Sequence, residues 1–250
     1  MTFKSIKIVF VVSLLFSSRG FAQDYTTARE VLNANLEATG GASNWAEIST
    51  VTSTGTRELD MPMGARESTF IKYDLYPGYS RTEETIESPM GSMEQLTIST
   101  PEGRWTTAMG GRRELPASTW ISTESAKDEL FLLSDDRVEL MDLETEIGDT
   151  GPEYVLSFKY EGETYQRKYN QFTLFLTAAE APGNDGSKNW TTFDDYQEVD
   201  GLQIPHTWES VASITINRGA GNNTSTITVV THLESISFND SLSDDLFAEE

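Results

Sequence analysis

The strongest constraint on the fold is a change of hydrophobic period at Thr50. Before it, residues 26–38 place Val31, Leu32 and Leu36 on one stripe of a helix. After it, polar and apolar residues alternate in segments of about ten residues, separated by glycine, proline or polar turns. Strands at this spacing are typical of an antiparallel β-sandwich or barrel. The chain is therefore predicted to be mainly β with a few helices.

The N-terminal helix has start and stop signals of its own. Thr26 or Thr27 can cap its first turn, and Gly40 and Gly41 can end it, because glycine readily takes the left-handed conformation found at helix ends. A further short helical turn is expected over 42–48, before the first strand.

The remaining elements follow from the alternation. A central segment, 116–134, loses the alternation, and a short helix is expected there over 125–133. The predicted strands are 50–59, 66–75, 79–86, 92–100, 104–109, 137–146, 153–161, 163–169, 172–178, 189–199, 204–217 and 225–238.

The acidic stretch 193–209 could be either a site or a hairpin. Its alternation places Phe193 on one face and Tyr196 on the other. Asp200-Gly201 is a strong hairpin signal, because both positions of such a turn need positive φ. The spacing of the carboxylates does not match a calcium loop. A hairpin with solvated carboxylates is the favoured interpretation.

Few residues are suited to catalysis or metal binding. The chain has no cysteine, and its histidines are His206 and His232. Zinc sites usually need more such ligands, and no G-x-S-x-G nucleophile turn is present. We therefore predict neither an enzyme nor a cofactor nor a metal. A carboxylate pair of the glycosidase type is not excluded by sequence.

The N-terminus has the pattern of a secretory signal peptide. Lys4 and Lys7 precede the apolar run 8–16, and small residues flank Phe21. The run is about half the length of a spanning helix, so cleavage near Gln23 is expected. Export without cysteines suits a bacterial periplasm.

After cleavage of 1–22, residues 23–250 are expected to form one domain. The composition, 37% hydrophobic with 10% aromatic residues, is sufficient for a core. The net charge of −22 repels phosphate backbones, so nucleic-acid binding is not expected. No second apolar segment is long enough to cross a bilayer.

Three stretches resemble the outer-membrane lipoprotein-sorting proteins, which share a LolA-like fold. They are "AREVLNANLEATGGASNWAEISTVTSTGT" (28–56), "FDDYQEVDGLQIPHTWE" (193–209) and "SISFNDSLSDDLF" (235–247). The resemblance implies a curved, incomplete antiparallel β-barrel, or half-barrel, packed against the N-terminal helix and the central short helix. It also implies a hydrophobic cavity between sheet and helices, which in the best-known members holds the acyl chains of a lipoprotein. Arg57 and Arg66 are the candidate counterparts of the arginine that locks the lid of those carriers.

We therefore expect a monomeric periplasmic carrier that binds lipid or lipoprotein acyl chains and exchanges them with donor or acceptor proteins of the inner or outer membrane. Apolar residues on the predicted sheet and central helix are the candidate cavity lining: Ile71, Tyr73, Leu75, Trp120, Leu130, Phe131, Leu133, Tyr154, Leu156, Phe158, Leu174 and Leu176. Which strand face points inward depends on register, since a shift of one residue inverts it.

Two alternatives remain open at this point. The same apolar residues could fill an ordinary core, which would make the protein an interaction module of the cell envelope. A deep polar cleft with two facing carboxylates would instead indicate a hydrolase.

Overall fold

The structure is a computed structural model. It describes residues 24–60, 64–87, 91–108, 111–115, 127–183, 187–218 and 221–248. The predicted signal peptide and Trp120 lie outside these ranges.

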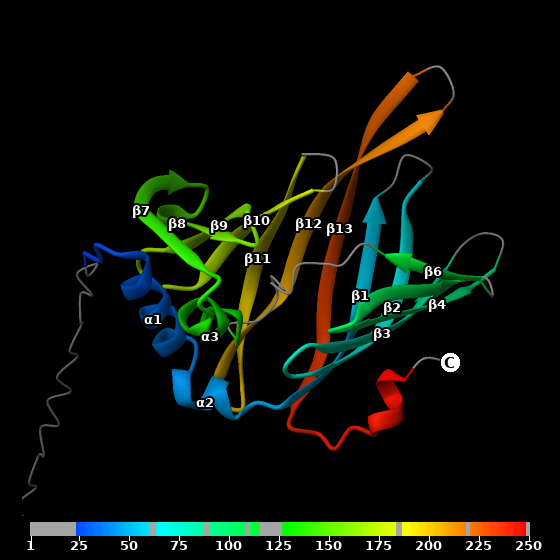
Figure 1. The fold of residues 1–250 in the computed structure, drawn as a ribbon, viewed down its shortest axis with the longest axis horizontal. Coiled ribbons are helices and arrows are strands. Elements are labelled where there is room, and N and C mark those ends of the chain that lie inside the picture. Colours follow the sequence, from blue (N-terminus) through cyan, green and yellow to red (C-terminus); the bar gives the residue numbers. More distant parts are fainter. Residues whose placement is uncertain are drawn as a thin grey trace, which may run out of the picture.

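The described chain runs from two helices into strands, with a third helix midway (Figure 1). The helices are α1 (Ala28–Ala38), α2 (Ala42–Glu47), α3 (Lys127–Ser134) and the 3-10 helix η1 (Asp244–Phe247). The strands are β1 (Thr50–Asp60), β2 (Arg66–Leu75), β3 (Tyr79–Ile86), β4 (Met93–Thr100), β5 (Gly103–Ala108), β6 (Gly111–Leu115), β7 (Glu139–Gly148), β8 (Gly151–Tyr160), β9 (Glu163–Asn170), β10 (Leu176–Pro182), β11 (Lys188–Val199), β12 (Leu202–Arg218) and β13 (Gly221–Phe238).

All the strands belong to one antiparallel sheet. Their order is β6-β5-β4-β3-β2-β1-β13-β12-β11-β10-β9-β8-β7. The two edge strands, β6 and β7, do not pair with each other, so the sheet curves without closing. The helices α1, α2 and α3, here called the helical layer, gather against one side of this curve (Figure 1). The predicted half-barrel with an N-terminal and a central helix is confirmed.

Helix α1 begins with a complete capping box. The side chain of Thr27 accepts a hydrogen bond from the backbone of Glu30, and the carboxylate of Glu30 accepts one from the backbone of Thr27. The helix buries Val31, Leu32 and Leu36, as the stripe predicts. This apolar face attaches α1 to the concave side of the sheet.

The C-terminal end of α1 meets the β11–β12 hairpin. The backbone of Gln203 donates to the carbonyl of Thr39 at 3.0 Å. Gly40 follows with a φ of 123°, and a Cβ there would lie 2.6 Å from the carbonyl oxygen of Gly201. Glycine is thus required both by the backbone conformation and by the close approach.

Two differences from the expected strands have local causes. Strand β6 was not predicted; it is a short, mostly exposed edge strand with little apolar signal. Strand β10 begins at Leu176 rather than at residue 172, because the side chain of Asn170 accepts from the backbones of Phe172 and Thr173 at 2.9 and 3.1 Å. This Asx-type turn uses the backbone donors that a strand would need.

The core has two parts. One lies under α1 and α3, where Leu32 and Leu132 pack against β8 and β9. The other lies under α2, where Trp45 packs with Leu202 and Ile204 of β12. The C-terminal 3-10 helix packs elsewhere: Phe247, 7% exposed, contacts Tyr79 with ring centroids 5.9 Å apart.

Candidate ligand-binding cavity

A cavity lies between the helical layer and six central strands, β2, β1, β13, β12, β11 and β10. Its volume is about 70 Å³, which is space for roughly five water-sized groups. The lining residues are Asn35, Thr39, Trp45, Val51, Ser53, Arg57, Phe70, Lys72, Asp74, Tyr76, Glu129, Leu176, Phe193, Tyr196, Gln203, Ile204, Pro205, Trp208, Leu233, Ile236 and Phe238.

On β2 the residues that line this cavity alternate with the candidate residues. Phe70, Lys72 and Asp74 line it. The candidates Ile71, Tyr73 and Leu75 alternate with them and so lie on the opposite face, where Ile71 is 38% exposed. The more apolar face of this strand points outward, and the inner face carries ion-paired residues.

On β11 the regular alternation is interrupted. Phe193 and Tyr196 both line the cavity, although simple alternation places them on opposite faces. Between them Asp195 has a φ of 52°, and its backbone N–H donates to the side chain of Asp194 at 2.8 Å. This distortion turns Tyr196 inward. The hairpin itself is as predicted, with φ values of 51° and 80° at Asp200 and Gly201.

The other candidate residues fall into two groups. Leu176 lines the cavity. Most of the rest pack into the core beneath α1 and α3: Phe131, Leu133, Tyr154, Leu156, Phe158 and Leu174. Leu130 packs in the core beneath α2. Helices therefore cover β8, and its candidate residues belong to the core. The sequence alone does not reveal which strands the helices cover.

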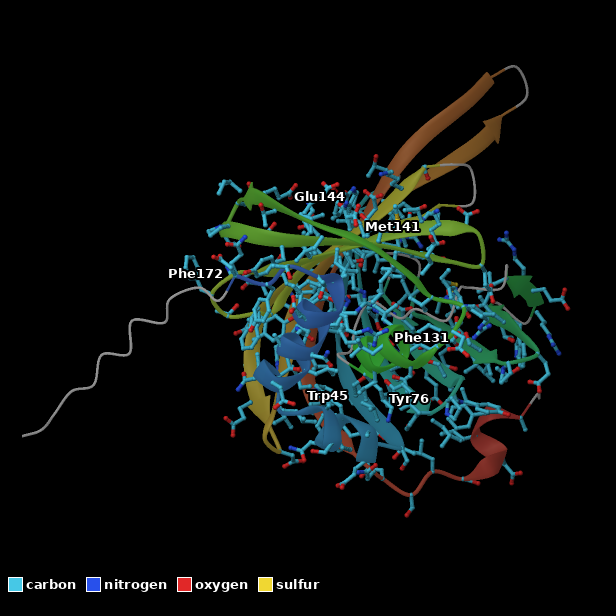
Figure 2. All side chains as sticks on the ribbon, turned by 60° about the vertical axis from the view of Figure 1, so that its left-hand side comes forward. Trp45, Tyr76, Phe131, Met141, Glu144 and Phe172 are labelled. Atoms are coloured by element: carbon cyan, nitrogen blue, oxygen red, sulfur yellow. The ribbon has the colours of Figure 1, made fainter. Side chains whose placement is uncertain are left out.

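The helical layer closes the cavity through side chains that hydrogen-bond to the backbone. Asn35 donates to the carbonyl of Leu174 at 2.8 Å. Lys127 of α3 donates to the carbonyls of Trp45 and Ile48, which ties α3 to the α2 region. Burial lowers the pKa of Lys127. In Figure 2, Trp45 and Phe131 lie within this layer, whereas Phe172, 66% exposed, lies at the margin.

A buried ion pair joins the helical layer to the sheet. Arg167 of β9 donates to Oε1 of Glu129 on α3, and the Tyr169 hydroxyl donates to the same oxygen at 2.8 Å. Asp128 lies 3.6 Å from the guanidinium. Burial is the largest single influence on Arg167 and acts to lower its pKa, but the charges of Glu129, Tyr169 and Asp128 together with the hydrogen bond to Glu129 outweigh it, and the pKa is raised. Burial also raises the pKa of Tyr169.

The cations on the sheet side of the cavity have partners on the sheet. Arg57 forms an ion pair with Glu84 at 3.2 Å and lies over the ring of Phe70. Lys72 pairs with Asp74 at 3.3 Å. The contacts described for Arg57 thus run to neighbouring strands rather than to the helical layer, which differs from the lid-locking role that the resemblance implied for it.

The histidines take part in ordinary strand contacts. Nδ1 of His206 lies 3.0 Å from the carbonyl of Ile204, and Nδ1 of His232 lies 3.2 Å from the hydroxyl of Thr207. Within the described ranges, no three His, Cys, Asp or Glu side chains are grouped as metal ligands would be.

Comparison with solved structures identifies the architecture. A LolA superfamily protein from Nitrosomonas europaea matches with a TM-score of 0.58 and 14% identity, covering 90% of this chain and 99% of that one. A protein domain from Vibrio parahaemolyticus described as outer membrane lipoprotein-sorting matches with a TM-score of 0.55 and 12% identity, covering 87% and 95%. A DUF1329 family protein from Desulfovibrio piger matches with a TM-score of 0.56 and 14% identity, covering 90% and 98%.

This chain has a LolA-like fold. No family model and no curated protein sequence matches it. In the LolA-like half-barrel described above, the cavity lies between the sheet and the helical layer. Among the helices within the described ranges, none has the length and apolar character needed to cross a bilayer.

Proposed function

We propose that the protein is a periplasmic carrier that holds alkyl chains of a lipid or lipoprotein without covalent chemistry. The observation that carries the proposal is the cavity of the LolA-like half-barrel, whose walls include Phe70, Leu176, Phe193, Trp208 and Leu233. Each methylene group moved from water into such surroundings contributes about 0.8 kcal/mol. A chain of moderate length can therefore be held by burial alone.

The size of the cavity sets how binding proceeds. A volume of about 70 Å³ accepts only a short alkyl segment, since each methylene group is about as large as a water molecule. A longer chain requires the helical layer to move away from the sheet. The polar contacts between this layer and the sheet include the buried ion pair between Glu129 of α3 and Arg167 of β9, and the hydrogen bond from Asn35 of α1 to the carbonyl of Leu174. In this proposal they act as a latch that opens for loading and release.

The proposal includes export to the periplasm, which rests on the N-terminal sequence pattern. It also includes exchange of cargo with membrane-associated donor and acceptor proteins. The protein acts as a monomeric binding protein and not as an enzyme. Cell fractionation of the full-length chain, with N-terminal sequencing of the mature form, tests the predicted cleavage near Gln23.

Lipid binding is tested on protein purified from a membrane-containing host. Native mass spectrometry should reveal lipid adducts on the mature chain, and a fluorescent fatty acid should bind and be displaced by unlabelled fatty acid. Absence of adducts together with absence of displaceable binding would contradict the carrier function. It would favour an interaction module with a filled core.

A further inference from the structure

Two buried oxygens at the lining of the cavity have no hydrogen-bond donor among the described residues. They are Oδ1 of Asn35 and Oε2 of Glu129. Both residues are 1% exposed, and both line the cavity. Buried acceptors are almost always paired in folded proteins, because leaving one unpaired loses the hydrogen bonds that water provided. Unpaired acceptors on residues that line a cavity are suited to a ligand that donates hydrogen bonds.

The two oxygens belong to the same region of the cavity. Asn35 is anchored to the carbonyl of Leu174 at 2.8 Å, just before β10. Glu129 is anchored to the hydroxyl of Tyr169, and Tyr169 pairs with Leu176 at the start of β10. The two side chains therefore lie beside the same short segment of chain.

Tyr196 adds a third acceptor to this region. Its hydroxyl donates to the carbonyl of Leu176 at 2.8 Å, which leaves lone pairs on the hydroxyl oxygen. Tyr196 and Glu129 both line the cavity. Burial raises the pKa of Tyr196, and the negative charge of Glu129 raises it further. We call Asn35, Glu129 and Tyr196 the acceptor end of the cavity.

The ion pairs differ between the two sides of the cavity. On the sheet side, Arg57 pairs with Glu84 and Lys72 pairs with Asp74. At the acceptor end, Glu129 pairs with Arg167 through Oε1, and its Oε2 accepts no hydrogen bond among the described residues. A donor from a ligand is therefore favoured at the second oxygen of Glu129.

We propose that the acceptor end binds the ammonium group of an alkyl amphiphile, whose chain lies among Phe70, Phe193 and Trp208. This inference rests on the carrier function proposed above and specifies its ligand. An ammonium group offers three donors and no acceptor, and its positive charge strengthens a hydrogen bond to the second oxygen of the Glu129 carboxylate. A hydroxyl offers a single donor without charge, and a carboxylate offers none and is repelled.

The test compares three ligands of equal chain length: octylammonium, 1-octanol and octanoate, each titrated into the full mature chain at pH 7 by calorimetry. The expected order of affinity is octylammonium, then octanol, then octanoate. In Glu129→Gln, octylammonium binding should weaken by roughly tenfold or more, because a charge-assisted hydrogen bond is lost. Octanol should change by less than about threefold in the same variant, since burial of the chain is unaffected. Octanoate should bind more tightly, because the charge that repels it is gone.

Two further variants guard against a general effect on folding. Glu180→Gln removes another buried carboxylate, which is 8% exposed, pairs with Lys188 and is not part of the cavity lining; it should leave all three affinities unchanged. Asn35→Ala removes the second acceptor and should weaken octylammonium selectively. Thermal unfolding of each variant checks that the fold persists, and Asn35→Ala decides the question if Glu129→Gln does not fold.

The outcomes separate this inference from the carrier function. If the three ligands bind with similar affinity and neither Glu129→Gln nor Asn35→Ala changes their order, the ammonium site is overturned and the carrier function stands. A preference for octanoate overturns it in the same way. If none of the three ligands binds, the carrier function and the ammonium site are both overturned.

Discussion

Arg167 of β9 and Glu129 of α3 form an ion pair whose side chains are each 1% exposed. The pair joins the sheet to the helical layer at the edge of the cavity. An ion pair so far from water is stable only because each charge compensates the other, so loss of one partner is far more costly than loss of a surface pair.

Arg167→Met should therefore destabilise the protein by about 3–5 kcal/mol, because Glu129 and Asp128 would remain buried without their cation. Urea unfolding of the mature chain measures this change. Arg137→Met is the matched control: Arg137 is 57% exposed and pairs with Asp135 and Glu161, and its loss should change the unfolding midpoint only slightly, because water screens exposed ion pairs. Equal costs for the two variants would contradict the structural role assigned to Arg167.

The capping box of α1 predicts a local pH effect. Hydrogen bonds from the backbone and hydroxyl of Thr26 and from Thr27 hold the pKa of Glu30 below its ordinary value of 4.5. Its contribution to stability is therefore present above pH 4.5 and is lost as the pH falls through the lowered pKa. A carboxyl titration by NMR should find the lowered pKa in wild type and its return toward 4.5 in Thr27→Ala. That variant should also lose about 1 kcal/mol at neutral pH, because the N-cap hydroxyl is gone.

Gly40 should tolerate no side chain. Gly40→Ala imposes a φ of 123° on alanine and places a Cβ 2.6 Å from the carbonyl oxygen of Gly201. Gly151 has a similar φ of 128°, but a Cβ there would meet no atom within 4 Å, so Gly151→Ala isolates the backbone cost, on the order of 1–2 kcal/mol. Gly40→Ala should cost a further 1–3 kcal/mol or so for the steric conflict. Equal melting temperatures for the two variants would show that the close approach is relieved without cost.

Filling part of the cavity should weaken binding without unfolding the protein. Ser53 lines the cavity on β1 and is 7% exposed. Ser53→Phe should weaken binding of a fluorescent fatty acid by about tenfold, which corresponds to exclusion of two methylene groups or so. Ile71→Phe, on the opposite face of β2, is the control and should bind as wild type does. The prediction fails if both variants bind equally well while both remain folded by circular dichroism.

Most of the architecture could be predicted from sequence, because it follows from local pattern. The helix stripe of Val31, Leu32 and Leu36, the Asp200-Gly201 turn and the alternation of the strands are each set within a few residues. The bounds of β2 and β3 match the predicted ranges. Strand β6 was missed because an exposed edge strand carries almost no apolar signal.

The lining of the cavity was harder to predict, because it depends on contacts between distant parts of the chain. The inner face of β2 is the one with Lys72 and Asp74, whose polarity is offset by pairing that no local pattern reveals. The inward turn of Tyr196 depends on the positive φ of Asp195. The aspartate pair Asp194-Asp195 is the only local signal for this distortion, since Asp tolerates that conformation better than most residues.

The most direct test of the carrier account is photo-crosslinking with a fatty acid that carries a diazirine on its alkyl chain, followed by mass spectrometric mapping of the modified residues. The account predicts adducts on Phe70, Leu176, Phe193 and Trp208, all of which an excess of unmodified fatty acid should abolish. Adducts confined to the outer face of the sheet, for example on Ile71 and Tyr73, or adducts that excess fatty acid does not reduce, would contradict it.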